Sequence, residues 1–284
     1  MIAAAVQMCS GDDVEKNLAT AERLARRARE RGAELIVLPE NFALMAASDE
    51  AKFAVAERID FEGLRAPHPS VGPQASASGP ILRRLGALAK ELGAFIVGGG
   101  MPERGPDERH VHNTNVVFDP SGELYVRYRK VHLFDVAIPD GASYHESATV
   151  APGDRPVTAD LPWFTLGLSV CYDLRFPELY RALVDQGARV VVVPAAFTLH
   201  TGKDHWHVLL RARAIENQVF VIAAAQQGRH PGNRTTYGHS LIVNPWGTVI
   251  AEADDGEGLA VAEIDLAVQE RVRREVPCLK HRRL

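Results

Sequence analysis

Residues 164–193 read FTLGLSVCYDLRFPELYRALVDQGARVVVV. The stretch begins and ends with apolar runs, Phe164–Val170 and Val190–Val193, which are expected to be strands, and the intervening Pro177–Gln186 is expected to be a helix. A run such as VVVV is apolar on both faces, as is usual for a buried strand that helices or a second sheet cover. The stretch therefore predicts an α/β fold.

The same alternation of strands and helices extends along the chain. Val14–Arg31 carries its apolar residues on one helical face, and Gly32 ends that helix. The Pro-, Gly- and Ser-rich segment Arg65–Pro80 is expected to be a mobile loop. Helices and hairpins spread along the whole chain favour two packed sheets with helices outside. Further helices are expected at Ile81–Leu92 and Trp206–Gln218, and strands or hairpin arms at Ile2–Met8, Leu35–Leu38, Phe95–Gly98, Asn115–Phe118, Leu124–Tyr128, Phe220–Ala225, Ser240–Val243 and Thr248–Ala251.

Size and composition are those of an ordinary globular protein. The 284 residues contain neither an internal repeat nor a clear linker, so we expect a single domain over residues 1–284 with a short C-terminal tail from about residue 267. Hydrophobic residues make up 46% of the chain and charged residues 24%. The formal net charge of −4 offers no basic surface, so nucleic acid is not an expected partner.

The sequence shows no sign of export or membrane insertion. The N-terminus, MIAAAVQMCSGDD, lacks a positively charged start and resembles a first strand more than a signal peptide. No apolar run approaches the ~18 residues that span a bilayer. The widely separated cysteines do not suggest a disulfide framework; Cys9 is interpreted as a small buried residue and Cys278 as an inert tail thiol. A cytoplasmic location without membrane contact is expected.

Three residues stand where an α/β fold presents side chains to a ligand. Cys171 follows the first strand of the quoted stretch, Glu40 follows the apolar run in AELIVLPENFAL (33–44), and Lys130 lies in ELYVRYRKVHLFD (123–135). A carboxylate can accept the thiol proton, and an ammonium favours the thiolate and stabilises an oxyanion. These three groups suffice for attack of the thiolate on a carbon bound to nitrogen. The attack gives a tetrahedral intermediate, ammonia or an amine leaves, and water hydrolyses the resulting thioester. Residue chemistry alone leaves open a buried cysteine, a helix-capping glutamate and a solvated lysine.

These residues lie in segments that resemble the nitrilase superfamily of carbon–nitrogen hydrolases. The resemblance covers the chain from Met1 to about Leu266, with the segments in the family's order: VQM, LIVLPENF, YRKVHLFD, SVCYDLRFPELYR, PAAFT, HWHVLLRARAIENQVFVIAAAQ and YGHSLIVNPWG. It implies a four-layer α-β-β-α sandwich and a catalytic triad. In that triad Glu40 would be the proton acceptor, Lys130 the oxyanion stabiliser and proton donor, and Cys171 the nucleophile.

The resemblance also implies a second active-site glutamate. Glu146, in ESATVAPGD (146–154), would position the lysine and the hydrolytic water. The alternative for Glu146 is a surface glutamate in a polar loop. The backbone N–H of Tyr172, directly after the nucleophile, is expected to be a second oxyanion donor.

Substrate contacts are expected from three further residues. Arg175 resembles a family arginine that holds a substrate carboxylate, and the alternative is a structural ion pair with Asp173 or Glu178. Phe197 and Thr201 lie in an expected loop that lines the substrate pocket in relatives, although Phe197 would fit the core equally well.

The histidines raise the question of a metal site. His110/His112 and His205/His207 are each two residues apart, a spacing that on a helix points the rings to different sides. His205 and His207 fall at the start of an expected helix, without a cysteine or carboxylate cluster of zinc-like spacing nearby, so no metal is expected. Relatives usually read HWE where this chain reads HWH, so His207 departs from the family pattern.

The sequence is interpreted as a cytoplasmic amidase that acts on a small carboxylate-bearing amide through a cysteine thioester, without metal or organic cofactor. The segments CYDLRFPELYR, PAAFT and LLRARAIENQ most resemble the deaminated-glutathione amidase branch of the superfamily. The alternatives are an ω-amidase acting on α-ketoglutaramate, an N-carbamoyl amino-acid hydrolase and a nitrilase. A non-catalytic scaffold is a different class, and the intact set of candidate catalytic residues argues against it.

A homodimer is also expected. Relatives usually pair through the helices beside the active-site cysteine. In this chain those helices carry apolar residues that one core does not obviously need, among them Leu179, Leu183, Leu209 and Leu210.

Overall fold

Two six-stranded sheets form the centre of the molecule, whose computed structural model describes residues 1–60, 76–137 and 143–283. The first sheet has the order β18-β1-β2-β5-β6-β7, and the second has the order β10-β11-β12-β13-β16-β17. The strands of the first sheet are β1 (Ile2–Gln7), β2 (Leu35–Leu38), β5 (Phe95–Arg104), β6 (Val111–Phe118), β7 (Leu124–Arg129) and β18 (Gly258–Glu263). Those of the second are β10 (Thr158–Asp160), β11 (Thr165–Leu168), β12 (Val190–Val192), β13 (Phe220–Ala223), β16 (Leu241–Val243) and β17 (Val249–Glu252).

Each sheet has a parallel centre and antiparallel edges. Strands β1, β2 and β5 are parallel in the first sheet, and β11, β12 and β13 are parallel in the second. The remaining strands add in hairpins or return connections, such as β6 with β7 and β16 with β17. Because parallel strands end at a common edge, each sheet has one edge suited to carry functional side chains.

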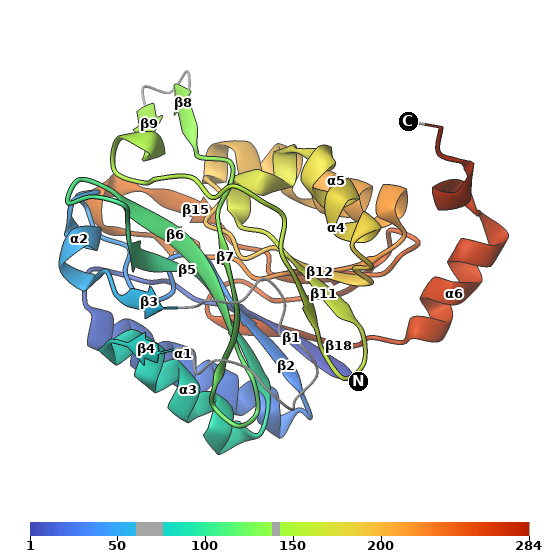
Figure 1. Ribbon diagram of the computed structural model, residues 1–284, viewed down its shortest axis with the longest axis horizontal. Helices are drawn as coiled ribbons and strands as arrows, with labels where there is room; N and C mark the ends of the chain where they lie inside the picture. Colours follow the sequence, from blue (N-terminus) through green and yellow to red (C-terminus); the bar gives the residue numbers. More distant parts are fainter. Residues whose placement is uncertain (61–75, 138–142, 284) are drawn as a thin grey trace.

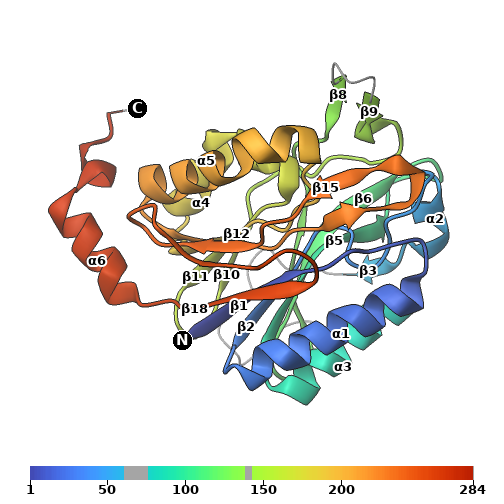
Figure 2. The ribbon, with the colours of Figure 1, turned by 180° about the vertical axis from the view of Figure 1, so that it is seen from behind.

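Helices cover the outer face of each sheet, which gives four layers, α-β-β-α (Figure 1, Figure 2). Helices α1 (Val14–Glu30) and α3 (Pro80–Leu92) lie against the first sheet, and α4 (Pro177–Asp185) and α5 (Leu199–Asn217) lie against the second. The carboxylate of Asp13 caps α1 by accepting a hydrogen bond from the backbone N–H of Lys16 at 3.1 Å. The α/β sandwich expected from the sequence is therefore confirmed.

Alternating burial in β1 shows how the layers are held together. Ala3 and Ala5 lie in the apolar cluster between the two sheets, whereas Ala4 and Val6 lie in the cluster beneath α1 and α3. Neighbouring residues of a strand point to opposite faces, so a strand between a sheet and a helix layer must be apolar throughout. This is the physical reason for the uninterrupted apolar runs in the sequence.

Shorter elements complete the fold. Helix α6 (Leu266–Glu275) lies beyond β18, near the C-terminus (Figure 1). Three small sheets pair β3 (Arg58–Asp60) with β4 (Ser76–Ser78), β8 (Asp135–Ala137) with β9 (Ser143–His145), and β14 (Gln227–Arg229) with β15 (Thr235–Tyr237). The other short helices are α2 (Ala51–Val55) and the 3₁₀ segments η1 (Glu146–Ala148), η2 (Cys171–Arg175), η3 (Pro231–Asn233) and η4 (Cys278–His281).

Three expectations need correction. Helix α5 begins at Leu199 rather than at residue 206, because the side chain of Thr198 accepts a hydrogen bond from the backbone N–H of Thr201 and starts the helix earlier. Most of the expected loop 65–80 lies outside the described residues, but residues 76–78 form β4 and α3 begins at residue 80. The expected tail contains α6, whose buried Gln269 donates to the backbone carbonyls of two other segments.

Among the described residues, no helix is both long and apolar enough to cross a membrane.

Candidate active site

The candidate catalytic residues meet at the carboxyl-end edges of the two sheets. Glu40 lies two residues beyond β2, Lys130 directly follows β7, and Cys171 begins η2 just beyond β11. All three side chains line one cavity of about 480 Å³, together with Glu146 at the start of η1. Segments that are up to 131 positions apart in the chain, from residue 40 to residue 171, are thus brought to one place.

Lys130 is the centre of the charged group. Its Nζ donates to Oε1 of Glu40 at 3.0 Å and to Oε2 of Glu146 at 2.9 Å. Lys130 and Glu40 are each only 2% exposed, so both charges are removed from water. Burial on its own would lower the pKa of Lys130, but the carboxylates of Glu146 and Glu40 raise it above its usual value. Lys130 is therefore a permanent ammonium.

Glu40 is held at both carboxylate oxygens. Oε1 accepts from Lys130 and from Nδ2 of Asn113 at 2.9 Å, and Oε2 accepts from the backbone N–H of Ala196 at 3.0 Å. Gly100, at φ 68°, allows the backbone to pass close by, since a Cβ there would stand 2.8 Å from Cγ of Glu40. The carboxylate is thus fixed in orientation before any ligand enters.

Glu146 completes the group from the other side of the lysine. Its Oε2 also accepts from the backbone N–H of Phe134 at 2.7 Å, and its Oε1 accepts from Asn113 at 3.2 Å. Burial works against its charge, but Lys130 and these hydrogen bonds hold the pKa of Glu146 below its usual value. The alternative of a solvated surface glutamate does not describe this side chain, which is 15% exposed and accepts hydrogen bonds at both oxygens.

The Cys171 backbone adopts φ 49°, an unusual conformation for a residue with a side chain. Its N–H donates to the carbonyl of Pro194 at 2.8 Å, which ties the turn to the end of the neighbouring strand β12. Burial raises the pKa of the Cys171 thiol well above its usual value, the charge of Glu40 raises it further, and Lys130 acts in the opposite direction. The resting thiol is therefore protonated and needs a base to become a nucleophile.

Buried Asp173 fixes the turn relative to the lysine strand. Its carboxylate accepts from the Tyr128 hydroxyl at 2.8 Å, from the backbone N–H of Val170 at 2.8 Å and from Nδ1 of His132 at 2.7 Å. Tyr128 and His132 lie two residues before and two residues after Lys130. One carboxylate thus sets the position of the Cys171 turn relative to the ammonium of Lys130.

The expected substrate-contact residues also reach the cavity. Tyr172, Arg175, Phe197 and Thr201 all contribute to its lining. In the described part of the chain Arg175 forms no ion pair; its Nη1 lies 3.2 Å from Nδ1 of His205, and its guanidinium lies over the rings of Tyr172 and Phe197. Asp173, the proposed alternative partner of Arg175, is engaged elsewhere. Thr201 contacts the cavity from the first turn of α5 rather than from a loop.

Sequence reasoning missed several lining residues. Asn113 bridges the two glutamates, and Lys52 and Arg234 add cationic groups to the cavity wall. The Nε of Arg234 is buried and has no hydrogen-bond partner among the described residues. Polar residues inside the apolar strand sequence VHNTNVVF were the available signal for Asn113, since a buried polar side chain requires a partner. Lys52 lies in the short helix α2 and Arg234 between η3 and β15, and neither segment carries such a signal.

The geometry suits nucleophilic chemistry rather than metal chemistry in this cavity. The ammonium of Lys130 occupies the space between the two carboxylates that a cation would otherwise take. With a neutral thiol beside it, the group carries one net negative charge. A proton can then pass from sulfur to Glu40 without a change in the total charge of the site. His207, in contrast, lies outside this cavity and contacts His239 and Glu252.

Known proteins similar to this chain include several amidases. The family profile described as Carbon-nitrogen hydrolase matches residues 2–274. A deaminated glutathione amidase of Synechocystis sp. is 45% identical over 284 residues, which cover 99% of this chain and 97% of the relative. That of Homo sapiens is 40% identical over 288 residues, with 99% of this chain and 82% of the relative covered.

Solved structures with the same fold come from the same superfamily. A Saccharomyces cerevisiae member of branch 10 of the nitrilase superfamily has a TM-score of 0.84 and 33% identity, over 100% of this chain and 97% of that one. A mutant of the amidase from Nesterenkonia sp. AN1, which shows Michael addition of acrylamide at the active site cysteine, has a TM-score of 0.73 and 28% identity, over 99% of each chain.

The protonation of Cys171 can be tested by alkylation. Because the charge of Glu40 raises the pKa of the Cys171 thiol, Glu40→Gln should move the midpoint of iodoacetamide alkylation to lower pH, by about one unit or more. Alkylation is followed by peptide mass spectrometry, which separates Cys171 from Cys9 and Cys278. Glu34→Gln, at the opposite end of the same strand, should leave the midpoint unchanged. An unchanged or higher midpoint in Glu40→Gln would show that the two groups are not coupled.

Proposed function

The chain belongs to the carbon–nitrogen hydrolase family and is an amidase, and from this premise we propose that it hydrolyses deaminated glutathione through a thioester on Cys171. The observation that carries the proposal is the hydrogen-bonded Glu40–Lys130–Glu146 group beside Cys171, in a cavity whose wall also presents Arg175. Full-length relatives named for this substrate support the choice of amide.

In the first half of the proposed reaction, Glu40 accepts the thiol proton as the sulfur of Cys171 forms a bond to the amide carbon. The carbonyl oxygen becomes an oxyanion, which the ammonium of Lys130 and the backbone N–H of Tyr172 stabilise. The proton held by Glu40 then passes to the amide nitrogen, the C–N bond breaks, and the amine leaves. The acyl group remains on sulfur as a thioester.

In the second half, a water molecule attacks the thioester while Glu40 accepts one of its protons. The C–S bond breaks, the proton returns to sulfur, and the carboxylic acid leaves. We assign Glu146 a supporting role: it fixes the lysine and orients the incoming water. Its hydrogen bonds to Lys130 and Phe134 support this assignment, because they leave the ammonium aimed at the cavity.

The cavity also favours an anionic substrate. Deaminated glutathione carries an α-keto acid on one side of the scissile amide and a Cys-Gly portion on the other, so it has a carboxylate at each end. Arg175 and Arg234 provide two separate guanidinium groups on the wall, and only a planar, permanently charged group binds carboxylates in a bidentate manner. A volume of about 480 Å³ lies within the usual range for such a ligand.

We also propose that the protein is cytoplasmic and dimeric. All three cysteines are unpaired, as is usual in a reducing compartment. The apolar surface expected to form the dimer cannot include Leu179, Leu183 and Leu210, because all three are buried in the core of the chain itself. Val208 and Ile215, spaced two helical turns apart on α5, are instead 65% and 48% exposed, and Trp246 next to the end of that helix is 58% exposed. This patch suits pairing about a twofold axis.

The proposed substrate and nucleophile are tested together. The purified protein should release product from deaminated glutathione faster than from α-ketoglutaramate, and simple nitriles should react least. Mass spectrometry with a slow substrate should show an acyl adduct on Cys171, and Cys171→Ala should abolish turnover, because members of a covalent unit do not act additively. Cys9→Ala is the matched control and should remain active. An adduct on Cys9 or Cys278, or an active Cys171→Ala variant, would refute the assignment.

Arg175 is tested by a conservative substitution. A lost charge-assisted contact typically costs about 1.5–3 kcal/mol, so Arg175→Lys should lower kcat/KM for an acidic amide roughly tenfold to a hundredfold. A neutral amide should lose much less, because it never makes this contact. Arg181→Lys, on α4 and outside the cavity lining, should leave both rates unchanged. Equal losses on acidic and neutral amides would assign Arg175 a structural role instead.

The dimer is tested by light scattering. Wild-type protein at micromolar concentration should have twice the 31.0 kDa mass of the chain. Val208→Asp places a charge in the apolar patch and should yield the single-chain mass. Val276→Asp, at an exposed valine near the C-terminus, should remain dimeric. A wild-type protein of single-chain mass would contradict the proposal.

A further inference from the structure

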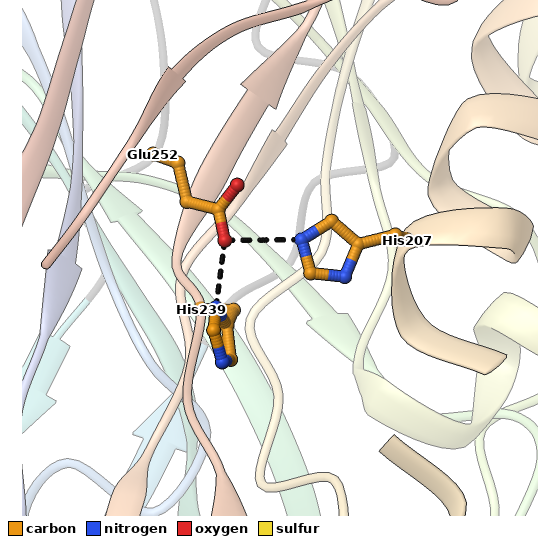
Figure 3. A group of neighbouring side chains, drawn as sticks. All are labelled: His207, His239 and Glu252. Atoms are coloured by element: carbon orange, nitrogen blue, oxygen red, sulfur yellow. Dashed lines mark hydrogen bonds and ion pairs between the residues drawn. The ribbon is translucent and has the colours of Figure 1, made fainter. Parts of the chain in front are cut away.

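Three metal-ligating side chains converge outside the active-site cavity (Figure 3). His207 comes from the middle of α5, His239 from the connection between β15 and β16, and Glu252 from the last position of β17. Oε1 of Glu252 lies 3.0 Å from Nε2 of His207 and 2.6 Å from Nδ1 of His239. One ligand atom from each residue lies within 4.8 Å of the other two.

The spacing of these atoms is close to what a metal ion requires. Zinc binds nitrogen and oxygen ligands at roughly 2.0–2.2 Å, so two ligands at a tetrahedral angle are about 3.3 Å apart. The carboxylate oxygen lies 3.0 Å from the ring nitrogen of His207 and 2.6 Å from that of His239, and both separations are shorter than this value. Side-chain rotations that lengthen these two contacts would admit an ion between the three groups.

The backbone around the group is held in place. The indole N–H of fully buried Trp206 donates to the carbonyl of His239 at 2.8 Å, which joins the neighbour of His207 directly to the second ligand. His239 has φ 59°, and its ring packs against Tyr237 with centroids 4.2 Å apart. Glu252 is paired with Leu241 in the sheet. His207 and Glu252 are thus presented by a helix and a strand, and the Trp206 hydrogen bond and the contact with Tyr237 hold the segment that carries His239.

The group is also accessible and chemically suitable for a metal ion. The three side chains are each about one-third exposed, so solvent can reach them and water can complete the coordination of an ion. Two imidazoles with one carboxylate form a donor set that suits zinc, nickel or copper rather than magnesium or calcium.

We propose that His207, His239 and Glu252 bind one divalent transition-metal ion of the zinc type, which fastens α5 to β17 and to the segment before β16. The first turn of α5 carries Thr201, which lines the active-site cavity, so the ion stiffens one wall of that cavity from the outside. The ion takes no part in the chemistry at Cys171. The site stands independently of the proposed substrate, since none of its ligands lines the cavity.

Calorimetric titration of the full chain, free of any affinity tag, with zinc chloride tests the site. We expect one ion per chain. His207→Gln and Glu252→Gln should each weaken zinc binding on the order of tenfold or more. Loss of a residue that only supports a metal ligand already weakens binding by about this factor, and these variants lose a ligand itself. His239→Asn should weaken zinc binding in the same way. Asparagine is chosen because it tolerates the left-handed backbone at that position.

His110→Gln is the matched control. His110 is a partly exposed histidine bonded to a carboxylate, Asp107, at 2.8 Å, and in the described part of the chain no third metal-ligating side chain joins this pair. This variant should bind zinc like the wild type. If all variants bind equally, or if the wild type does not bind, His207, His239 and Glu252 form only a hydrogen-bonded ion pair and the proposal is overturned.

Cobalt absorption and thermal unfolding provide readouts that are independent of affinity. Cobalt bound by imidazole and carboxylate gives weak visible bands, whereas an intense near-ultraviolet band would reveal a cysteine ligand and overturn the assignment. Zinc should raise the unfolding temperature of the wild type, because a ligand that binds only the folded state stabilises it. The increase should be absent in Glu252→Gln and present in His110→Gln. An equal increase in both variants would contradict the proposal.

Discussion

The buried ammonium of Lys130, held between two carboxylates, is the constraint on which the site depends. Moving a charge out of water costs several kcal/mol, and a buried ion that loses its partner destabilises a protein by about 3–5 kcal/mol. The ammonium therefore needs both Glu40 and Glu146 within about 3 Å, a distance that leaves no tolerance for a misplaced strand. Glu40 follows β2, Lys130 follows β7, and both strands belong to the same sheet. The register of the first sheet thus determines whether the charge can be buried at all.

Cys171 follows a strand of the other sheet, so other contacts must fix its position relative to Lys130. Cys171 adopts a positive φ, which costs on the order of 1–3 kcal/mol and persists only where the surroundings determine it. The surroundings here are the carbonyl of Pro194 and the buried carboxylate of Asp173, which reaches across to residues on either side of Lys130. Asp173 therefore joins the two sheets where their chemical groups meet. The position of Cys171 beside Lys130 therefore results from packing between the layers rather than from the turn alone.

The sequence predicted those features that rest on local pattern. Strand β2 was predicted at its observed bounds because an apolar run ends sharply at Pro39 and Glu40. Asn113 was missed, since its function depends on the approach of two glutamates from other segments. The start of α5 was placed seven residues late, because LHTGKDH lacks the apolar spacing of a buried helix and Thr198 caps it instead. The proximity of His207 to His239 and Glu252 could not be foreseen either, because it depends on sheet pairing and helix packing over 45 residues.

Helix α5 explains why local pattern fails where function is concentrated. An ordinary surface helix has one buried stripe and one solvated face, and its sequence shows this at once. In α5, Trp206 and Leu210 are buried in the core, whereas Val208 is exposed on another side and Thr201 lines the cavity. His207 faces β17 on yet another side. A helix that must satisfy a core, a cavity, a carboxylate and an exposed apolar patch cannot keep a single apolar stripe. The irregular spacing of apolar residues in α5 therefore indicates that several faces of the helix make contacts other than those with the core.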